Sequence, residues 1–129
     1  MANSGDYTRW VRFAEEEFVA AGTLMKDSPH TAVYLLQQSS EKYLKAVLFF
    51  QGIDPPLSHN LRELVQMVSP QILSSSPEIK AARLINAVSI PARYPSELDD
   101  PTIEEAEAVQ NAATVLRLHA RVLLGLETR

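Results

Sequence analysis

Apolar residues in this 129-residue chain recur at spacings of three and four, and groups of prolines separate the segments that show this pattern. Such spacing places side chains on one face of an α-helix. Proline interrupts a helix, because it has no amide proton and its ring clashes with the preceding turn. We find no segment of useful length with the alternation of a half-buried strand. The sequence therefore predicts an all-α fold.

Five helices follow from the apolar pattern, its breaks and its capping residues. They are expected from about Tyr7 to Met25, from Pro29 to about Gln51, from Ser58 to Ser69, from Pro77 to about Ile90, and from Thr102 to about Leu124. The run Thr102-Ile103-Glu104-Glu105 matches a capping box. Three prolines make the stretch from Pro91 to Pro101 a stiff, non-helical loop. We expect one domain over residues 1–129, an up-and-down bundle of four to five helices framed by the first, second and last.

Composition narrows the classes of function. Twelve basic and sixteen acidic residues give a net charge of −4, which disfavours strong DNA binding. The chain has no Cys, which excludes disulfides, thiolate zinc sites and a cysteine nucleophile, and which fits a cytoplasmic protein. Its longest strongly apolar run, Ala46 to Phe50, is too short to cross a bilayer. The start of the sequence also lacks the order of a signal peptide, so we expect no membrane association.

The predicted second helix is unusually polar in its middle, Gln37-Gln38-Ser39-Ser40-Glu41-Lys42-Tyr43-Leu44-Lys45-Ala46. Glu41 precedes Lys45 by four residues, an arrangement worth only a few tenths of a kcal/mol on an exposed surface. That value is too small to explain the polar stripe by itself. A proline-broken corner follows and leads to Ser58-His59-Asn60-Leu61.

Few residues outside this stretch carry recognisable chemistry. No phosphate-binding loop, dinucleotide fingerprint or His-Glu-x-x-His sequence is present. His30, His59 and His119 lie in different segments, so we expect neither a metal nor a cofactor. His119, with Arg117 and Arg121 near a helix end, is interpreted as a solvated or interface residue.

Two groups of residues keep two interpretations each. The His59 ring either bonds across the corner to the second helix, or contacts a ligand as part of a polar network with Glu41 and Lys45. Arg93 and Tyr94 either bind a phosphate and stack on a base, or pack on the bundle with Arg93 paired to a carboxylate such as Glu41.

Four elements together resemble the HEPN domain family, the higher eukaryotes and prokaryotes nucleotide-binding domain, in its stand-alone prokaryotic type. They are Trp10, the run Gln37-Gln38-x-x-Glu41-Lys42-x-Leu44-Lys45-Ala46, the corner Ser58-His59-Asn60-Leu61, and Ala92-Arg93-Tyr94-Pro95. The resemblance implies a homodimeric helical bundle that binds nucleotides. It also implies a minimal nucleotidyltransferase partner, in a pair that behaves as toxin and antitoxin. Active members are metal-independent ribonucleases with an Arg-x(4–6)-His motif.

This chain departs from that motif. Counting from Arg93, the histidine position falls on Leu98, Asp99 or Asp100, and no other arginine precedes a histidine at this spacing. We therefore expect a non-catalytic nucleotide- and partner-binding module rather than an enzyme. The alternatives are a degenerate or unusual metal-independent ribonuclease toxin, and a purely structural dimer. The expected ligand-binding residues are Gln38, Glu41, Lys42, Lys45, His59, Arg93 and Tyr94.

Overall fold

The computed structural model describes residues 7–93 and 100–129, and for residues 91–93 it describes the backbone alone. This part of the chain forms five helices and no strand, which confirms the all-α prediction. The helices are α1 (Tyr7–Leu24), α2 (Pro29–Phe50), α3 (Leu61–Val68), α4 (Pro77–Arg93) and α5 (Ile103–Leu124).

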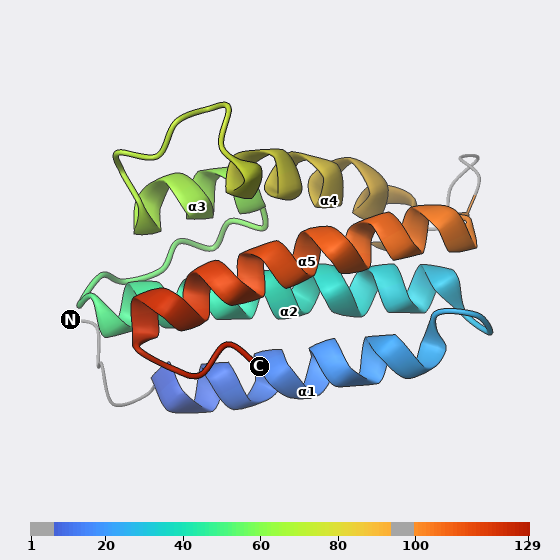
Figure 1. The fold of residues 1–129 in the computed structure, drawn as a ribbon, viewed down its shortest axis with the longest axis horizontal. Helices are drawn as coiled ribbons and strands as arrows, with labels where there is room; N and C mark the ends of the chain where they lie inside the picture. The colour runs from blue at the N-terminus through green and yellow to red at the C-terminus, as the bar shows by residue number, and fades with distance from the viewer. Residues whose placement is uncertain (1–6, 94–99) are drawn as a thin grey trace.

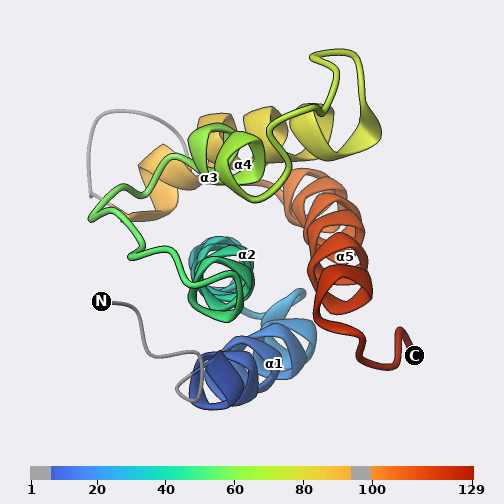
Figure 2. The same ribbon diagram turned by 90° about the vertical axis from the view of Figure 1, so that its left-hand side faces the viewer.

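Helix α2 is the centre of the bundle. It packs against each of the other four helices. Figure 1 shows α1 and α5 running alongside it, and the end-on view in Figure 2 shows α3 and α4 forming a layer over α2 and α5. More than half of its 22 residues are buried, as a helix with neighbours on several sides requires.

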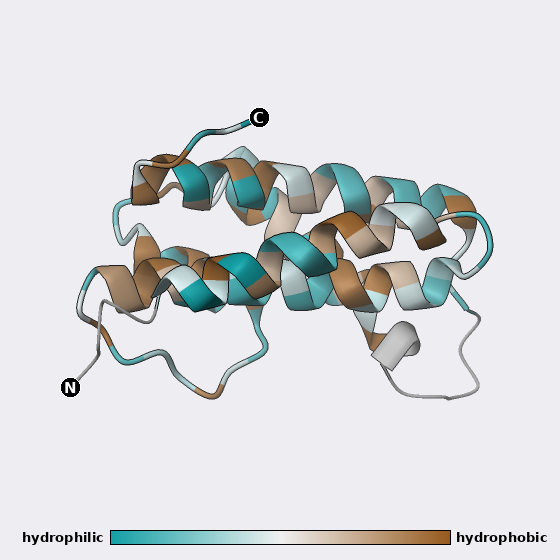
Figure 3. Cartoon of the chain, turned by 90° about the horizontal axis from the view of Figure 1, so that it is seen from below, coloured by the Kyte–Doolittle hydropathy of each residue, from teal (hydrophilic) through white to brown (hydrophobic). Residues whose placement is uncertain are grey.

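The core consists of one apolar face from each helix. Figure 3 shows both hydrophilic and hydrophobic residues along the helices nearest the viewer, as amphipathic helices require. In α5 the apolar residues at helical spacing from Ala106 to Ala120 are buried, and the small ones among them allow close approach to α2 and α4. Three residues that the apolar spacing assigns to the core are exposed instead: Phe50 at 44%, Leu84 at 38% and Leu123 at 36%. Phe50 is the last residue of α2, where its ring lies 5.1 Å from that of Tyr7.

The ends of α5 agree with the sequence prediction. Thr102 Oγ1 accepts a hydrogen bond from the Glu105 amide at 3.0 Å, and the Glu105 carboxylate accepts one from the Thr102 amide at 2.9 Å. The two bonds form the predicted capping box. At the other end Gly125 has a φ of 71°, the left-handed conformation that glycine adopts without strain.

The start of α3 differs from the prediction. The N-cap is Asn60 rather than Ser58, and its Oδ1 accepts from the amides of Arg62 and Glu63 at 3.1 and 3.3 Å. The Asn86 side chain of α4 donates to the same oxygen at 2.9 Å, and its own oxygen accepts from the Leu61 amide at 3.1 Å. This contact with α4 therefore decides which of two good capping residues begins the helix.

The end of α4 also differs, since the helix continues through Pro91 to Arg93. A proline removes a single amide hydrogen bond from a helix, and α4 extends only two residues beyond it. The rest of the expected loop, residues 94–99, lies outside the described residues. In the part of the chain that the structure describes, no helix is long and apolar enough to span a membrane.

We expect Asn60→Ala to lower the free energy of unfolding by about 1–2 kcal/mol, because it removes the cap of α3 and its contact with Asn86. Urea unfolding followed by circular dichroism measures the change. Asn111→Ala is the matched control, since Asn111 is an exposed residue inside α5 and alanine favours a helix interior. Equal stability of the two variants would show that the cap does not hold α3.

Candidate functional site

The polar residues in the middle of α2 are buried. Gln37, Ser39 and Ser40 are each 1% exposed, and Glu41 and Lys45 are each 7% exposed. The value of a few tenths of a kcal/mol, which holds for an exposed pair, therefore does not apply to Glu41 and Lys45. A buried charge is costly unless partners satisfy it, so the surroundings of Glu41 decide what this part of the protein can do.

Three side chains surround the Glu41 carboxylate. Gln37 Nε2 donates to Oε1 at 3.0 Å, Lys45 Nζ donates to Oε2 at 3.0 Å, and His59 Nδ1 lies 2.9 Å from Oε1. We refer to Gln37, Glu41, Lys45 and His59 as the Glu41 cluster. The His59 ring thus bonds across the corner to α2, which is the first of its two interpretations, and its partner Glu41 also binds Lys45. Contact of His59 with a ligand stays a prediction.

The cluster determines the charge of Glu41 and the tautomer of His59. Burial raises the pKa of Glu41, but the hydrogen bonds from His59, Lys45 and Gln37 together bring that pKa below its ordinary value. Glu41 is therefore ionised at neutral pH, and an ionised carboxylate only accepts hydrogen bonds. The proton of the contact must then sit on His59 Nδ1, and in the neutral ring Nε2 is an acceptor. The His59 side chain is 57% exposed, so a ligand can reach it.

Gln38 and Lys42 were expected beside Glu41 and Lys45, but neither contacts the Glu41 carboxylate directly. Gln38 Nε2 donates to Gln37 Oε1 at 2.9 Å. The Lys42 ammonium pairs with Glu17 of α1 at 2.9 Å and lies 3.4 Å from Gln38 Oε1. Gln38 therefore borders the Glu41 cluster, whereas Lys42 is turned towards α1.

The other predicted site residues cannot be placed in this arrangement. Tyr94 and the Arg93 side chain lie outside the described residues, so their convergence with Lys45 and His59 stays a prediction. The pairing of Arg93 with Glu41 stays a prediction as well.

A second buried cluster was not foreseen from the sequence. Arg117 of α5, 8% exposed, donates two hydrogen bonds to the Glu15 carboxylate of α1, at 2.8 and 3.0 Å. The Tyr43 hydroxyl of α2 donates to Glu15 and accepts from Arg121 at 3.1 Å. The bonds from Arg117 hold the pKa of Glu15 below its ordinary value. Because these residues join three helices, we assign them a role in packing.

The three histidines do not converge. His119 was interpreted as solvated or at an interface, but it is partly buried, and its Nε2 lies 2.9 Å from the hydroxyl of Ser69 at the end of α3. His30 contacts the neighbouring Thr31. Among the described residues, no group of three or more His, Asp or Glu side chains could hold a metal ion.

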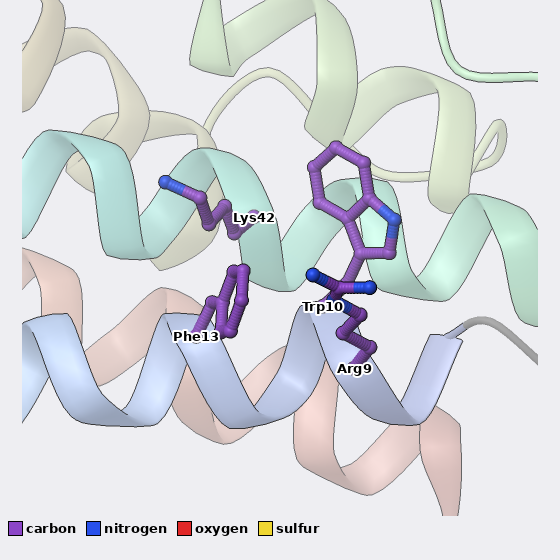
Figure 4. Close-up of a pocket in the computed structure, with 4 residues that line it drawn as sticks. All are labelled: Arg9, Trp10, Phe13 and Lys42. Carbon is purple, nitrogen blue, oxygen red and sulfur yellow. The ribbon is translucent and has the colours of Figure 1, made fainter.

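A pocket of about 490 Å³ lies between α1 and α2 (Figure 4). Arg9, Trp10, Phe13 and Lys42 line it, and we call it the Arg9 pocket. Trp10 and Phe13 follow the apolar spacing that is typical of a core face, yet both are only partly buried. Periodicity identifies the face that a residue occupies, and it does not reveal where neighbouring helices leave a gap.

The family of the chain follows from comparison with known proteins. The model of the HEPN domain matches residues 7–122. The chain belongs to the HEPN domain family, which confirms the resemblance inferred from its motifs. No curated protein sequence matches the chain.

Two solved structures share the fold. The crystal structure of TT1696 from Thermus thermophilus has a TM-score of 0.80 and 19% sequence identity, over 92% of this chain and 98% of that one. The crystal structure of ST0689, an archaeal HEPN homologue, has a TM-score of 0.67 and 22% identity, over 97% and 98%. At these identities the two structures support the fold alone.

We expect Glu41→Gln to lower the free energy of unfolding by about 3 kcal/mol at pH 7, because it leaves the Lys45 ammonium buried without its partner. The pKa of Glu41 is lowered in the folded protein from an ordinary value of 4.5. Its contribution is therefore present above about pH 4.5 and is lost as the pH falls through the folded-state pKa. The difference in stability between native protein and variant should narrow accordingly.

Urea unfolding at neutral and at acid pH measures this difference. Glu107→Gln is the matched control, since Glu107 is an exposed glutamate on α5, and it should change stability little at either pH. A Glu41→Gln difference that stays constant below about pH 4.5 would contradict the assignment.

Proposed function

We propose that this HEPN domain is a nucleotide- and partner-binding module that does not cleave RNA, and that it acts as a homodimer with a minimal nucleotidyltransferase. The observation that carries the nucleotide part is the Glu41 cluster, in which one buried carboxylate positions both Lys45 and His59. The partner and the dimer are proposed from membership of the family.

The Glu41 cluster suits recognition of a phosphate group. Lys45 and the exposed His59 ring bind the same carboxylate, so an ammonium and an imidazole are held close together where one phosphate group could contact both. Glu41 also fixes the orientation of the ring before a ligand arrives, which reduces the entropy lost on binding. Arg93 and Tyr94 are proposed to complete the site by binding a second phosphate oxygen and stacking on the base.

One feature of the sequence favours binding over catalysis. The histidine of the ribonuclease motif is replaced at each allowed position after Arg93, by Leu98, Asp99 or Asp100. Cleavage at a ribose 2′-hydroxyl needs a group that exchanges a proton near neutral pH. An aspartate does so only with a strongly raised pKa.

We expect titration calorimetry to detect ATP or another nucleotide binding to the native protein at millimolar concentrations. Lys45→Ala and His59→Ala should each weaken that binding about tenfold, because each removes one charge-assisted contact to phosphate. Lys80→Ala is the matched control, since Lys80 is an exposed lysine on α4, and it should leave the affinity unchanged. Thermal unfolding of each variant confirms that it folds. The absence of heat with native protein at millimolar ligand would rule out the nucleotide part of the proposal.

The contact between Glu41 and His59 favours a metal-independent ribonuclease as the second candidate function. A carboxylate on Nδ1 leaves Nε2 as an acceptor in the neutral ring, the form that a general base needs. We nevertheless expect purified protein incubated with RNA and EDTA to cleave no more than a protein-free control. Cleavage that His59→Ala abolishes would replace the binding proposal with this one.

A further inference from the structure

We propose that the Arg9 pocket binds a small molecule that joins a planar aromatic ring to a phosphate or carboxylate group. The ring lies against Trp10 and Phe13, and the anionic group is bound by Arg9 and Arg12. This site is separate from the Glu41 cluster and does not depend on the function proposed above.

The pocket provides surfaces for a planar ring. Trp10 and Phe13 are partly buried, and the Trp10 ring is supported from α2 by Phe49, 5.3 Å away between ring centres. The ammonium of Lys42 is held by Glu17, and Figure 4 shows it pointing away from Arg9 and Trp10. The aliphatic part of Lys42 therefore forms the remaining wall. The volume of about 490 Å³ falls within the range of roughly 300–1,000 Å³ that is typical of small-molecule sites.

Two arginines provide the charge for an anionic group. The guanidinium carbons of Arg9 and Arg12 lie 5.3 and 5.1 Å from the centre of the Phe13 ring. Both side chains are exposed, and neither forms an ion pair with a carboxylate of the described residues. Arg9, Arg12 and Thr8 line a second hollow of about 450 Å³, so Arg9 borders both spaces. An anion held there leaves its ring within reach of Trp10.

The dipole of α1 does not account for Arg9. The first turn of α1 contains Arg9 and no acidic residue, although the helix dipole favours negative charge at that end. Arg9 and Arg12 are three residues apart, where like charges on a helix repel each other. Stacking on Phe13 stabilises one cation, but a second on the same ring adds this repulsion. A bound anion would offset both the unfavourable charge at the start of α1 and the repulsion between Arg9 and Arg12.

The fluorescence of Trp10 tests the site directly, because Trp10 is the single tryptophan of the chain. We expect adenosine 5′-monophosphate, nicotinate or both to quench its emission in a saturable manner. Adenosine provides the ring without the anion, and inorganic phosphate provides the anion without the ring. Adenosine alone and inorganic phosphate alone should each quench the Trp10 emission much less than a ligand that carries both groups. Phenyl phosphate and benzoate carry the same ring, so whichever of these two binds more tightly identifies the anionic group as phosphate or carboxylate.

Variants separate this site from the Glu41 cluster. Arg9→Gln should weaken the quenching ligand at least about fivefold through the loss of a charged contact. Arg83→Gln, at an exposed arginine of α4, is the matched control and should have no effect. Arg9 is exposed, so the Arg9→Gln variant should have the same unfolding temperature as the native protein. The proposal is overturned if neither adenosine 5′-monophosphate nor nicotinate quenches, or if adenosine or phosphate alone quenches equally. It is also overturned if His59→Ala abolishes the quenching while Arg9→Gln retains it.

Discussion

The burial of the Glu41 carboxylate in the central helix is the constraint on which the rest of the arrangement depends. A carboxylate that is 7% exposed needs several donors, and α2 itself supplies two of them, Gln37 and Lys45. The third, His59, comes from the corner that follows α2. Asn60, the N-cap of α3, directly follows His59, so the bond to Glu41 holds the chain beside the point where α3 begins.

The Glu15–Arg117 ion pair holds α1 and α5 together beside α2, just as the Glu41 cluster holds the corner against α2. α1 and α5 both pack on α2, and Arg117, Glu15 and the Tyr43 hydroxyl connect all three. An apolar face of alanines and leucines favours burial without specifying one alignment. Polar groups that must find particular partners add that specification, and we infer that these two clusters set the registers of the bundle.

Local patterns in the sequence were enough to predict the fold but not the surroundings of each residue. The spacing of apolar residues predicts the number of helices. The capping residues predict the two ends of α5, at its capping box and at Gly125. Burial of Glu41 and Lys45 depends on how many helices surround α2, which a single period does not encode. The Glu15–Arg117 pair joins residues 102 positions apart, beyond any local pattern. The Arg9 pocket is likewise a property of how α1 and α2 meet.

The shortness of α3 has a consequence for how this protein fluctuates. Eight residues are too few for a helix that is stable alone, so α3 depends on its apolar face and on the hydrogen bonds that it shares with Asn86 of α4. Loss of that contact releases the cap at Asn60, and with it the adjoining His59. We therefore expect the corner with His59 and helix α3 to open together as one cooperative unit, while α2 stays folded. Amide hydrogen exchange would detect this opening. Local opening would then break the contact between His59 and Glu41 and expose the Glu41 carboxylate to solvent.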